Sequence, residues 1–237
     1  MLKELVFLTG GSSGVGGALL RLLLENDYYV INVSRREPSV PTHLSHQFFH
    51  ISCDLTDKGF YHKLCNRIED FKFCDFKLKG YVHCAGVGQK KKLSDLTIEE
   101  IESTIGLNLT SGIIISKILI PHLDKASSKI LFLGSRSRRF AFSGGVAYSS
   151  SKAGLFSVVD AMALEFRESK WNIGVTLFEF GTIGTGFAGL PVSSNQISVE
   201  GAADIIFRSF LLPISDFDVR VVEVVPSVQR LACTTVV

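Results

Sequence analysis

The chain has 237 residues, of which 46% are hydrophobic and 20% are charged, and its formal net charge is +2. This size suits one α/β domain with a large core, so we expect residues 1–237 to fold as a single domain. The nearly balanced charge argues against nucleic acid as a partner, because the basic run Lys90–Lys92 is only a triplet, which we expect to be a solvated loop.

Short apolar runs alternate along the chain with longer amphipathic stretches. The runs are continuously apolar, which is typical of strands covered by helices on both faces. We therefore predict an α/β fold of the Rossmann type, with a doubly wound, mostly parallel sheet of about seven strands and helices on both faces. The predicted strands are Leu5–Leu8, Tyr29–Val33, Gln47–Ile51, Gly80–Cys84, Ile130–Leu133, Ile173–Phe178 and Val219–Val225. The predicted helices are Gly14–Glu25, Gly59–Phe71, Ile98–Leu119, Tyr148–Glu168 and Gly201–Phe210.

The first residues, Met1–Leu8, are too short an apolar segment for a signal peptide, and no apolar run reaches the length of a membrane span. We therefore expect no membrane association. The five cysteines form no Cys-x-x-Cys pair and have no zinc-site spacing, and their odd number argues against a disulfide framework. These features predict a cytoplasmic protein without a metal site.

Three glycines, Gly10, Gly14 and Gly16, stand where the first strand meets the first helix. A glycine-rich turn at this place lets the backbone approach a pyrophosphate, while the helix amino terminus supplies unpaired N–H groups. The same residues are also ordinary loop chemistry, but their position at the start of a strand–helix–strand unit favours a dinucleotide site.

Tyr148 and Lys152 form a Tyr-x-x-x-Lys stretch, and Ser135 lies thirteen residues before the tyrosine. On a helix, residues four apart share one face, so the lysine could lower the pKa of the tyrosine. An ammonium about 5 Å away would supply roughly 3 kcal/mol, nearly enough to bring a phenol close to neutrality. Taken singly, the alternatives are a turn-capping serine and a chance Tyr-x-x-x-Lys pattern.

Together these motifs make the sequence resemble the short-chain dehydrogenase/reductase family over nearly its whole length. The glycine turn is spaced Gly-x-x-x-Gly-x-Gly, as in that family, and the other motifs follow in the family's order. They are Asp54, Ala85-Gly86, Asn108, Ser135, Tyr148, Lys152, and Gly181 followed by Thr185.

The resemblance implies a nicotinamide dinucleotide as cofactor. Asp54 would contact the adenine, although it could instead simply cap a turn. Ile183 and Thr185 would meet the carboxamide side of the nicotinamide. The full set of expected cofactor-binding residues is Gly10, Ser12, Ser13, Gly14, Val15, Gly16, Arg35, Arg36, Asp54, Leu55, Ala85, Gly86, Tyr148, Lys152, Gly181, Ile183 and Thr185.

The end of the second predicted strand reads Ser34-Arg35-Arg36. An acid there would bind the ribose diol of NAD(H), whereas a base favours the 2′-phosphate of NADP(H). Ser34 stands where NAD-preferring members have the acid, and Arg35 follows it, so we predict NADP(H). The alternative is that both arginines are solvated. Ser13 replaces a second basic residue that many NADP-dependent members carry.

The resemblance further implies an oxidoreductase that interconverts a carbonyl and a secondary alcohol. Tyr148 would be the acid/base and Lys152 would tune its pKa, while Ser135 would hydrogen-bond the substrate oxygen. Asn108 would steady a water behind the lysine, or else mark a helix irregularity. A lid at Gly186–Ser198, with apolar residues Phe187, Leu190 and Val192, indicates a small or medium substrate such as a ketone, a 3-hydroxy or 3-oxo acid or a pterin.

Two positions depart from the family's pattern. Cys84 replaces an asparagine after the fourth strand, and Phe180 replaces a proline before Gly181. Neither is a catalytic group, but both leave room for an alternative, a non-catalytic NADP(H)-sensing regulator with the same fold. Cys84 itself could be a redox sensor, although a cysteine that ends an apolar strand is more often inert.

Arg136, Arg138 and Arg139 follow Ser135 closely. We hypothesise that they attract an anionic substrate or the cofactor phosphate; the alternatives are exposure to solvent and ion pairs with a partner subunit. Family members commonly pair the helices predicted at Ile98–Leu119 and Tyr148–Glu168 across a two-fold axis, and both are apolar on more than one side here. A homodimer or homotetramer is therefore expected, unless these apolar sides are core.

Overall fold

The computed structural model describes residues 2–189, 193, 195–213 and 218–227. Within them, seven strands form one sheet in the order β3-β2-β1-β4-β5-β6-β7, and every neighbouring pair is parallel. The doubly wound fold predicted from the sequence is thus confirmed. The strands are β1 (Lys3–Thr9), β2 (Tyr29–Ser34), β3 (Phe48–Ser52), β4 (Phe76–His83), β5 (Ser128–Leu133), β6 (Ile173–Phe180) and β7 (Val221–Val224).

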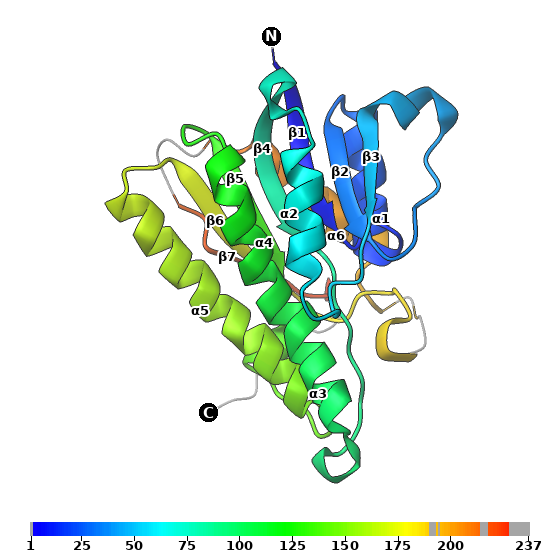
Figure 1. The fold of residues 1–237 in the computed structure, drawn as a ribbon. Coiled ribbons are helices and arrows are strands. Elements are labelled where there is room, and N and C mark those ends of the chain that lie inside the picture. The colour runs from blue at the N-terminus through cyan, green and yellow to red at the C-terminus, as the bar shows by residue number, and fades with distance from the viewer. Residues whose placement is uncertain (1, 190–192, 194, 214–217, 228–237) are drawn as a thin grey trace.

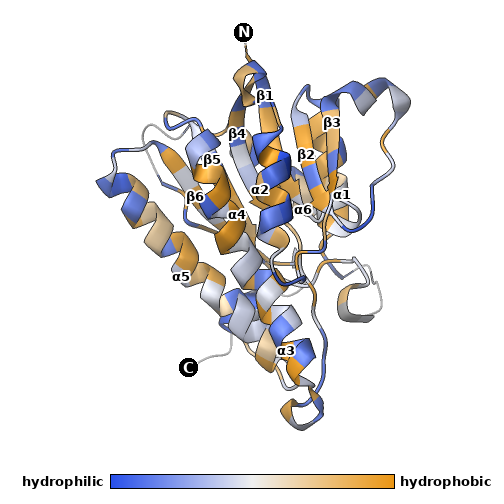
Figure 2. Ribbon diagram, viewed as in Figure 1, coloured by the Kyte–Doolittle hydropathy of each residue, from blue (hydrophilic) through white to orange (hydrophobic). Residues whose placement is uncertain are grey.

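Helices cover both faces of the sheet (Figure 1). The strand residues alternate between two buried apolar clusters, one on each side, so the strands are apolar on both faces (Figure 2). This is why their sequences are continuously rather than alternately hydrophobic. On one face lie α1 (Gly14–Glu25) and α6 (Val199–Leu211), and on the other lie α2 (Phe60–Glu69), α4 (Ser111–Leu119) and α5 (Val146–Glu168), with α3 (Ile98–Ile105) packed against α5.

The predicted helix Ile98–Leu119 is not uniform. A π-helical segment, Gly106–Thr110, separates α3 from α4. It contains Asn108, whose side chain exchanges two hydrogen bonds with the backbone of Val87 and is fully buried. The wider π-helical turn therefore turns this amide inward, as π-bulges often do at functional sites.

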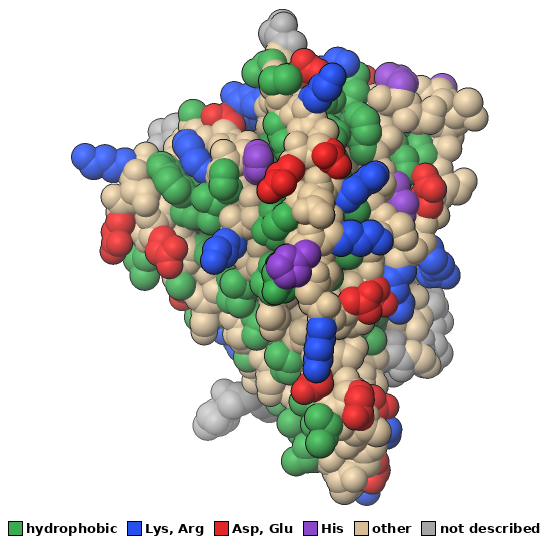
Figure 3. Space-filling view, viewed as in Figure 1, with side chains coloured by type: hydrophobic (Ala, Val, Ile, Leu, Met, Phe, Trp, Pro, Cys, Tyr) green, Lys and Arg blue, Asp and Glu red, His purple; other side chains and the backbone are tan. Residues whose placement is uncertain are grey.

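The helical stretch Ile98–His122 is long and apolar enough, by length and composition, to cross a membrane, contrary to the expectation from the sequence. Its inner residues Ile115 and Leu119 are nevertheless fully buried in the core against the sheet. Its outer face is also partly apolar, and Figure 3 shows hydrophobic side chains gathered over α4 and α5. Ile113 and Leu164 are 43% and 49% exposed there.

His83, the last residue of β4, joins the sheet to the π-helical segment. Its Nε2 lies 3.2 Å from the carbonyl oxygen of Leu107, and its Nδ1 lies 3.0 Å from Thr9 Oγ1 and 2.8 Å from the Tyr81 hydroxyl. Because a carbonyl only accepts, Nε2 carries the proton and Nδ1 accepts. Burial and the charge of Lys152 lower the pKa of His83 to about 3. The imidazole is therefore neutral in the folded protein.

We predict that His83 makes the protein acid-labile. The unfolded chain takes up a proton below a pH of about 6.5, whereas folded His83 stays neutral down to about 3. The free energy of unfolding should therefore fall over this window by up to about 1.4 kcal/mol per pH unit. Urea unfolding across this pH range should show a shallower slope for His83→Gln. The control is His43→Gln, which alters an exposed residue of the 3-10 helix Thr42–Gln47 and should leave the slope unchanged. Equal slopes for wild type and His83→Gln would contradict the prediction.

Candidate active site at the carboxyl edge of the sheet

The turn after β1 is shaped by its glycines. Gly10 and Gly14 adopt positive φ angles of +74° and +54°, which other residues rarely tolerate. A Cβ at Gly10 would lie 2.8 Å from the backbone nitrogen of Ala85, and one at Gly16 would lie 2.4 Å from the Gly10 carbonyl oxygen. The backbone is therefore tightly folded against the end of β4, where no side chain fits.

The amino terminus of α1 has the properties of an anion site. Ser13 precedes the helix in an extended conformation, its hydroxyl makes no capping hydrogen bond, and the first turn contains no acidic residue. The unpaired N–H groups therefore carry the full positive end of the helix dipole. Thr185, in the loop after β6, lies opposite, with its Cγ2 3.6 Å from where a Cβ of Gly14 would stand. These residues fit a dinucleotide pyrophosphate.

A buried amide, Asn32, connects this turn to the end of β2. Its Oδ1 accepts the Gly11 N–H at 2.9 Å, and its Nδ2 donates to Ser34 Oγ at 2.9 Å. Ser34 in turn donates to the carbonyl oxygen of Arg36 at 2.7 Å. The sequence prediction did not include Asn32, although a fully buried polar residue in an apolar strand needs such partners.

The structure brings together two of the predicted cofactor-binding residues, Arg35 and Asp54. The guanidinium Nη1 of Arg35 lies 3.8 Å from Asp54 Oδ2, and the arginine side chain is 76% exposed. Asp54 also accepts hydrogen bonds from the backbone and hydroxyl of Thr56. Partial burial acts to raise the pKa of Asp54, but the Thr56 hydrogen bonds and Arg35 outweigh it and lower the pKa. Asp54 thus caps a turn through Thr56 and at the same time faces Arg35.

The side chains of Ser135, Tyr148 and Lys152 converge behind the end of β5. Ser135 is hydrogen-bonded to Tyr148, and its Oγ accepts the N–H of Ser137 at 3.2 Å. Lys152 is 4% exposed; its Nζ donates to the carbonyl oxygen of Leu133 at 2.7 Å and lies 5.8 Å from the centre of the Tyr148 ring. A hydroxyl, a phenol and an ammonium therefore meet at one point, as the motif spacing predicts.

The electrostatics differ from the sequence-based expectation that the lysine lowers the pKa of the tyrosine. Burial raises the pKa of Tyr148, and the hydrogen bond from Ser135 offsets this only in part. Burial also lowers the pKa of Lys152, to about 8. The cost of burying each charged form, absent from a two-charge estimate, dominates both groups.

Asn108 fixes the loop after β4 rather than facing the lysine directly. Besides its two bonds to Val87, its Nδ2 donates to Ser151 Oγ at 3.0 Å, next to Lys152 in α5. A Cβ at Gly86 would lie 3.3 Å from Asn108 Oδ1 and 3.8 Å from Lys152 Nζ. The backbone of the loop after β4 therefore lies close to both the Asn108 side-chain amide and the Lys152 ammonium at Gly86. The π-helical segment agrees with the sequence-based alternative of a helix irregularity at Asn108, and the expected role of steadying a water behind Lys152 stays a prediction.

The remaining predicted cofactor-binding residues lie along the same edge. Gly181 donates its N–H to the Val224 carbonyl oxygen at 2.8 Å, and Ile183 pairs with Ile197 in an isolated bridge. Leu190 and Val192 of the predicted lid lie outside the described residues. Ser12 and Val15 belong to the glycine turn and the start of α1, while Leu55 is buried beside Asp54.

The three arginines after Ser135 form ion pairs with acids of the same chain, an arrangement that was not among the sequence-based alternatives. Arg138 and Arg139 both donate to the carboxylate of Glu179, which is fully buried in β6. Arg139 and Arg136 also pair with Glu223 of β7, at 2.8 and 3.0 Å. This ion-pair cluster could not be predicted from the sequence, because its acids, Glu179 of β6 and Glu223 of β7, lie far from the arginines along the chain.

The surroundings of Cys84 disfavour the reactive thiolate that a redox sensor needs. Burial raises the pKa of its thiol to about 12, so it is protonated at neutral pH and a poor nucleophile.

Lys91, which we expected from the sequence to be solvated, forms an ion pair with Glu100 at 2.8 Å. Within the described residues, no group of three or more His, Cys, Asp and Glu side chains could hold a metal ion.

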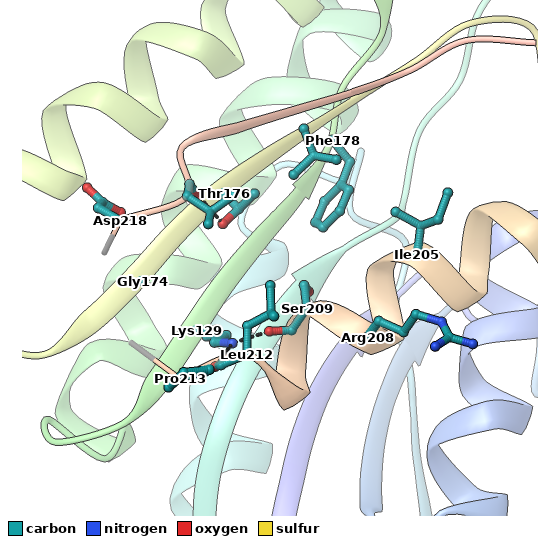
Figure 4. Close-up of a pocket in the computed structure, with 12 residues that line it drawn as sticks. Lys129, Gly174, Thr176, Phe178, Ile205, Arg208, Ser209, Leu212, Pro213 and Asp218 are labelled. Carbon is teal, nitrogen blue, oxygen red and sulfur yellow. Dashed lines mark hydrogen bonds between the residues drawn. The ribbon is translucent and has the colours of Figure 1, made fainter. Parts of the chain in front are cut away.

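A cavity of about 190 Å³ lies elsewhere, between the sheet and α6 (Figure 4). Lys129, at the amino end of β5, borders it and donates to the carbonyl oxygens of Ser209 and Leu212, which end α6. Burial lowers the pKa of this lysine to about 8. Ser135 follows the opposite end of the same strand, so this cavity is separate from the convergent site. Its lysine serves as a cap for the last turn of α6.

Known proteins that resemble this chain in sequence or in fold include dehydrogenases and reductases by name. Residues 4–193 match the family model described as short chain dehydrogenase. Benzil reductase ((S)-benzoin forming) of Bacillus cereus is 26% identical over 192 residues, covering 76% of each chain. The 3-oxoacyl acyl-carrier-protein reductase MabA of Mycobacterium tuberculosis is 26% identical over 181 residues, covering 76% of this chain and 69% of its own. An alcohol dehydrogenase of Thermococcus sibiricus, complexed with 5-hydroxy-NADP, superposes with a TM-score of 0.81 at 21% identity, covering 96% and 98% of the two chains.

We predict that Glu179 is a large contributor to stability. Glu179→Ala would leave Arg138 buried without its carboxylate, at a cost of about 3 kcal/mol in unfolding free energy. Glu223, whose side chain is 36% exposed, is the comparison, and Glu223→Ala should cost about 1 kcal/mol or less. Urea unfolding of both variants measures the difference. A Glu179→Ala protein as stable as Glu223→Ala would show that the buried carboxylate is not needed.

Proposed function

Because this chain belongs to the short chain dehydrogenase family, we propose that it is an NADP(H)-dependent oxidoreductase that interconverts a carbonyl and a secondary alcohol. The observation that carries the proposal is the meeting of Ser135, Tyr148 and Lys152 beside an anion-binding helix terminus. The matched relatives named benzil reductase and acyl-carrier-protein reductase also act on carbonyl groups by name.

The cofactor would lie across the carboxyl edge, with its pyrophosphate at the amino terminus of α1 and its nicotinamide near Thr185. The preference for NADP(H) rests on Arg35, whose exposed guanidinium could bind a 2′-phosphate, and on Ser34, which stands where an acid at the end of β2 would repel that phosphate. The phosphate would share the Arg35 guanidinium with the carboxylate of Asp54, 3.8 Å away. The related alcohol dehydrogenase of Thermococcus sibiricus, solved with a form of NADP, supports the same choice.

When bound, the reduced nicotinamide supplies the hydride, and this chain's residues manage the oxygen and the proton. Ser135 would hold the carbonyl oxygen by turning toward it the hydroxyl hydrogen that it shares with Tyr148, while its Oγ accepts the Ser137 N–H. Tyr148 would transfer the phenolic proton to that oxygen. Its raised pKa keeps the phenol protonated at neutral pH, which suits the direction of reduction.

Lys152 would act through its charge and its hydrogen bonds. With a pKa of about 8 it is mostly an ammonium at neutral pH, and one of its three protons is used by Leu133. The other two can serve the cofactor and the tyrosine, lowering the cost of the phenolate that remains after proton transfer. Asn108 would hold the loop after β4, and with it Gly86, at the distance this arrangement needs.

The substrate would be small or medium in size, because Phe187, just beyond Thr185, places its ring centre 5.7 Å from that of Tyr148. A homodimer or homotetramer would pair the exposed apolar residues Ile113 and Leu164 of α4 and α5. The four cysteines in the described part of the chain are free, which is in keeping with a reducing compartment, and we propose the cytoplasm.

Replacing Arg35 tests the cofactor. We predict that the wild-type protein binds NADPH more tightly than NADH, and that Arg35→Ala weakens NADPH binding about tenfold by loss of a charged hydrogen bond. NADH binding should change little. Nicotinamide fluorescence titrations give the dissociation constants, with Arg21→Ala on the exposed face of α1 as the control. Preference of the wild type for NADH would overturn the assignment.

Replacing Tyr148 tests the chemistry. Tyr148→Phe removes only the phenolic oxygen, so kcat for ketone reduction should fall at least about a hundredfold while NADPH still binds. Steady-state assays and fluorescence titration separate the two effects. A wild-type protein that binds NADPH yet reduces no carbonyl compound, with Tyr148→Phe indistinguishable from it, would favour the non-catalytic regulator instead.

A further inference from the structure

Two other aromatic rings, from different loops, lie near the ring of Tyr148. Phe142 precedes α5, and its ring centre lies 6.4 Å from that of Tyr148 at an interplanar angle of 48°. Phe187 follows β6, at 5.7 Å and 51°. The two phenylalanines are 41% and 38% exposed, so each keeps much of its ring uncovered. Uncovered aromatic surface therefore lies beside the proposed proton donor.

Two glycines create the room for these rings. A Cβ at Gly88 would lie 2.5 Å from Phe187 Cε1 and 3.1 Å from Tyr148 Cδ2. A Cβ at Gly145 would lie 2.7 Å from Phe142 Cζ. Contacts this short would force each phenyl ring to move from the position it occupies beside the tyrosine. The backbone thus provides a fitted place for each ring, which distinguishes Phe142 and Phe187 from scattered surface aromatics.

The charges beside this site are balanced. The guanidinium groups of Arg138 and Arg139 share the buried carboxylate of Glu179, and Arg136 and Arg139 share that of Glu223. An anionic substrate would have to compete with these fixed carboxylates for the arginines. The site therefore offers aromatic surface to a substrate, with its nearest arginines already paired.

We propose that the substrate is a neutral ketone with an aryl group on the carbonyl carbon. The inference rests on the function proposed above and specifies its substrate class. The aryl group would pack against Phe142 and Phe187 while the oxygen meets Ser135 and Tyr148. The carbonyl carbon gains a hydride from NADPH and the oxygen gains the Tyr148 proton, giving a secondary aryl alcohol and NADP⁺. Only a ring close to the carbonyl can reach both phenylalanines, because both lie next to the Tyr148 ring.

Matched ketones test this with the full-length protein and NADPH. Acetophenone and cyclohexyl methyl ketone share a carbon skeleton and differ in aromaticity, and conjugation makes the aryl ketone intrinsically the less reactive toward hydride. We expect kcat/KM to favour acetophenone by about tenfold, the size of one good aromatic contact. Methyl 4-acetylbenzoate should likewise be preferred over the anion 4-acetylbenzoate.

Variants locate the preference. In Phe142→Leu/Phe187→Leu, which keeps apolar bulk but removes both rings, the ratio of kcat/KM for acetophenone to that for cyclohexyl methyl ketone should fall to one or below, since the intrinsic reactivities favour the cyclohexyl ketone. Phe140→Leu is the control, because Phe140 is on the same loop but its ring contacts Arg136 instead of Tyr148. Its ratio should match the wild type.

The outcomes separate the two proposals. Reduction of both ketones with no aryl preference, a preference that survives in the double leucine variant, or faster reduction of the anion would each overturn the aryl-ketone inference alone. Failure to reduce any ketone despite NADPH binding would overturn the proposed function, and with it this inference.

Discussion

The site depends on one constraint, the common direction of all seven strands. Because every strand is parallel to its neighbours, all carboxyl ends lie at one edge of the sheet. Gly10 follows β1, Ser135 follows β5 and Thr185 follows β6, so residues far apart in the chain become neighbours at that edge. An antiparallel pairing at any one strand would carry its loop to the opposite edge and remove its part of the site.

Buried polar groups then set the positions of the loops. Asn32, His83, Asn108 and Lys152 each hydrogen-bond a backbone group outside their own element. A buried polar group without a partner is costly, so each of these contacts resists displacement of a loop. Glu179 does the same with charge, since it anchors the arginine-rich turn beside Ser135 to β6. The edge of the sheet is therefore rigid where the proposed chemistry needs rigid geometry.

The fold could be predicted from the sequence because continuous apolar strands and the glycine turn depend on local pattern. The convergence of Ser135, Tyr148 and Lys152 was also predictable, from helical spacing and motif order. The partners of Arg138 and the aromatic neighbours of Tyr148 were not, because they come from β6 and from loops whose paths no local pattern specifies. The pKa of Tyr148 was expected in the wrong direction, because desolvation depends on the finished packing. An irregularity at Asn108 was one of the alternatives that the sequence offered, but the bounds of the π-helical segment Gly106–Thr110 were not predicted, because helical periodicity continues on both sides of it.

The strand order also constrains how the protein is made. β1 lies between β2 and β4, and its register pairs Lys3 with Phe76, so one edge of the first strand stays open until β4 has been synthesised. At translation speeds of about 5–20 residues per second, that interval lasts roughly 4 to 15 seconds. During this time the apolar residues Leu5–Leu8 are exposed on the nascent chain beside an unpaired backbone edge. The arrangement that assembles the proposed active site thus also delays the pairing of the first strand during synthesis.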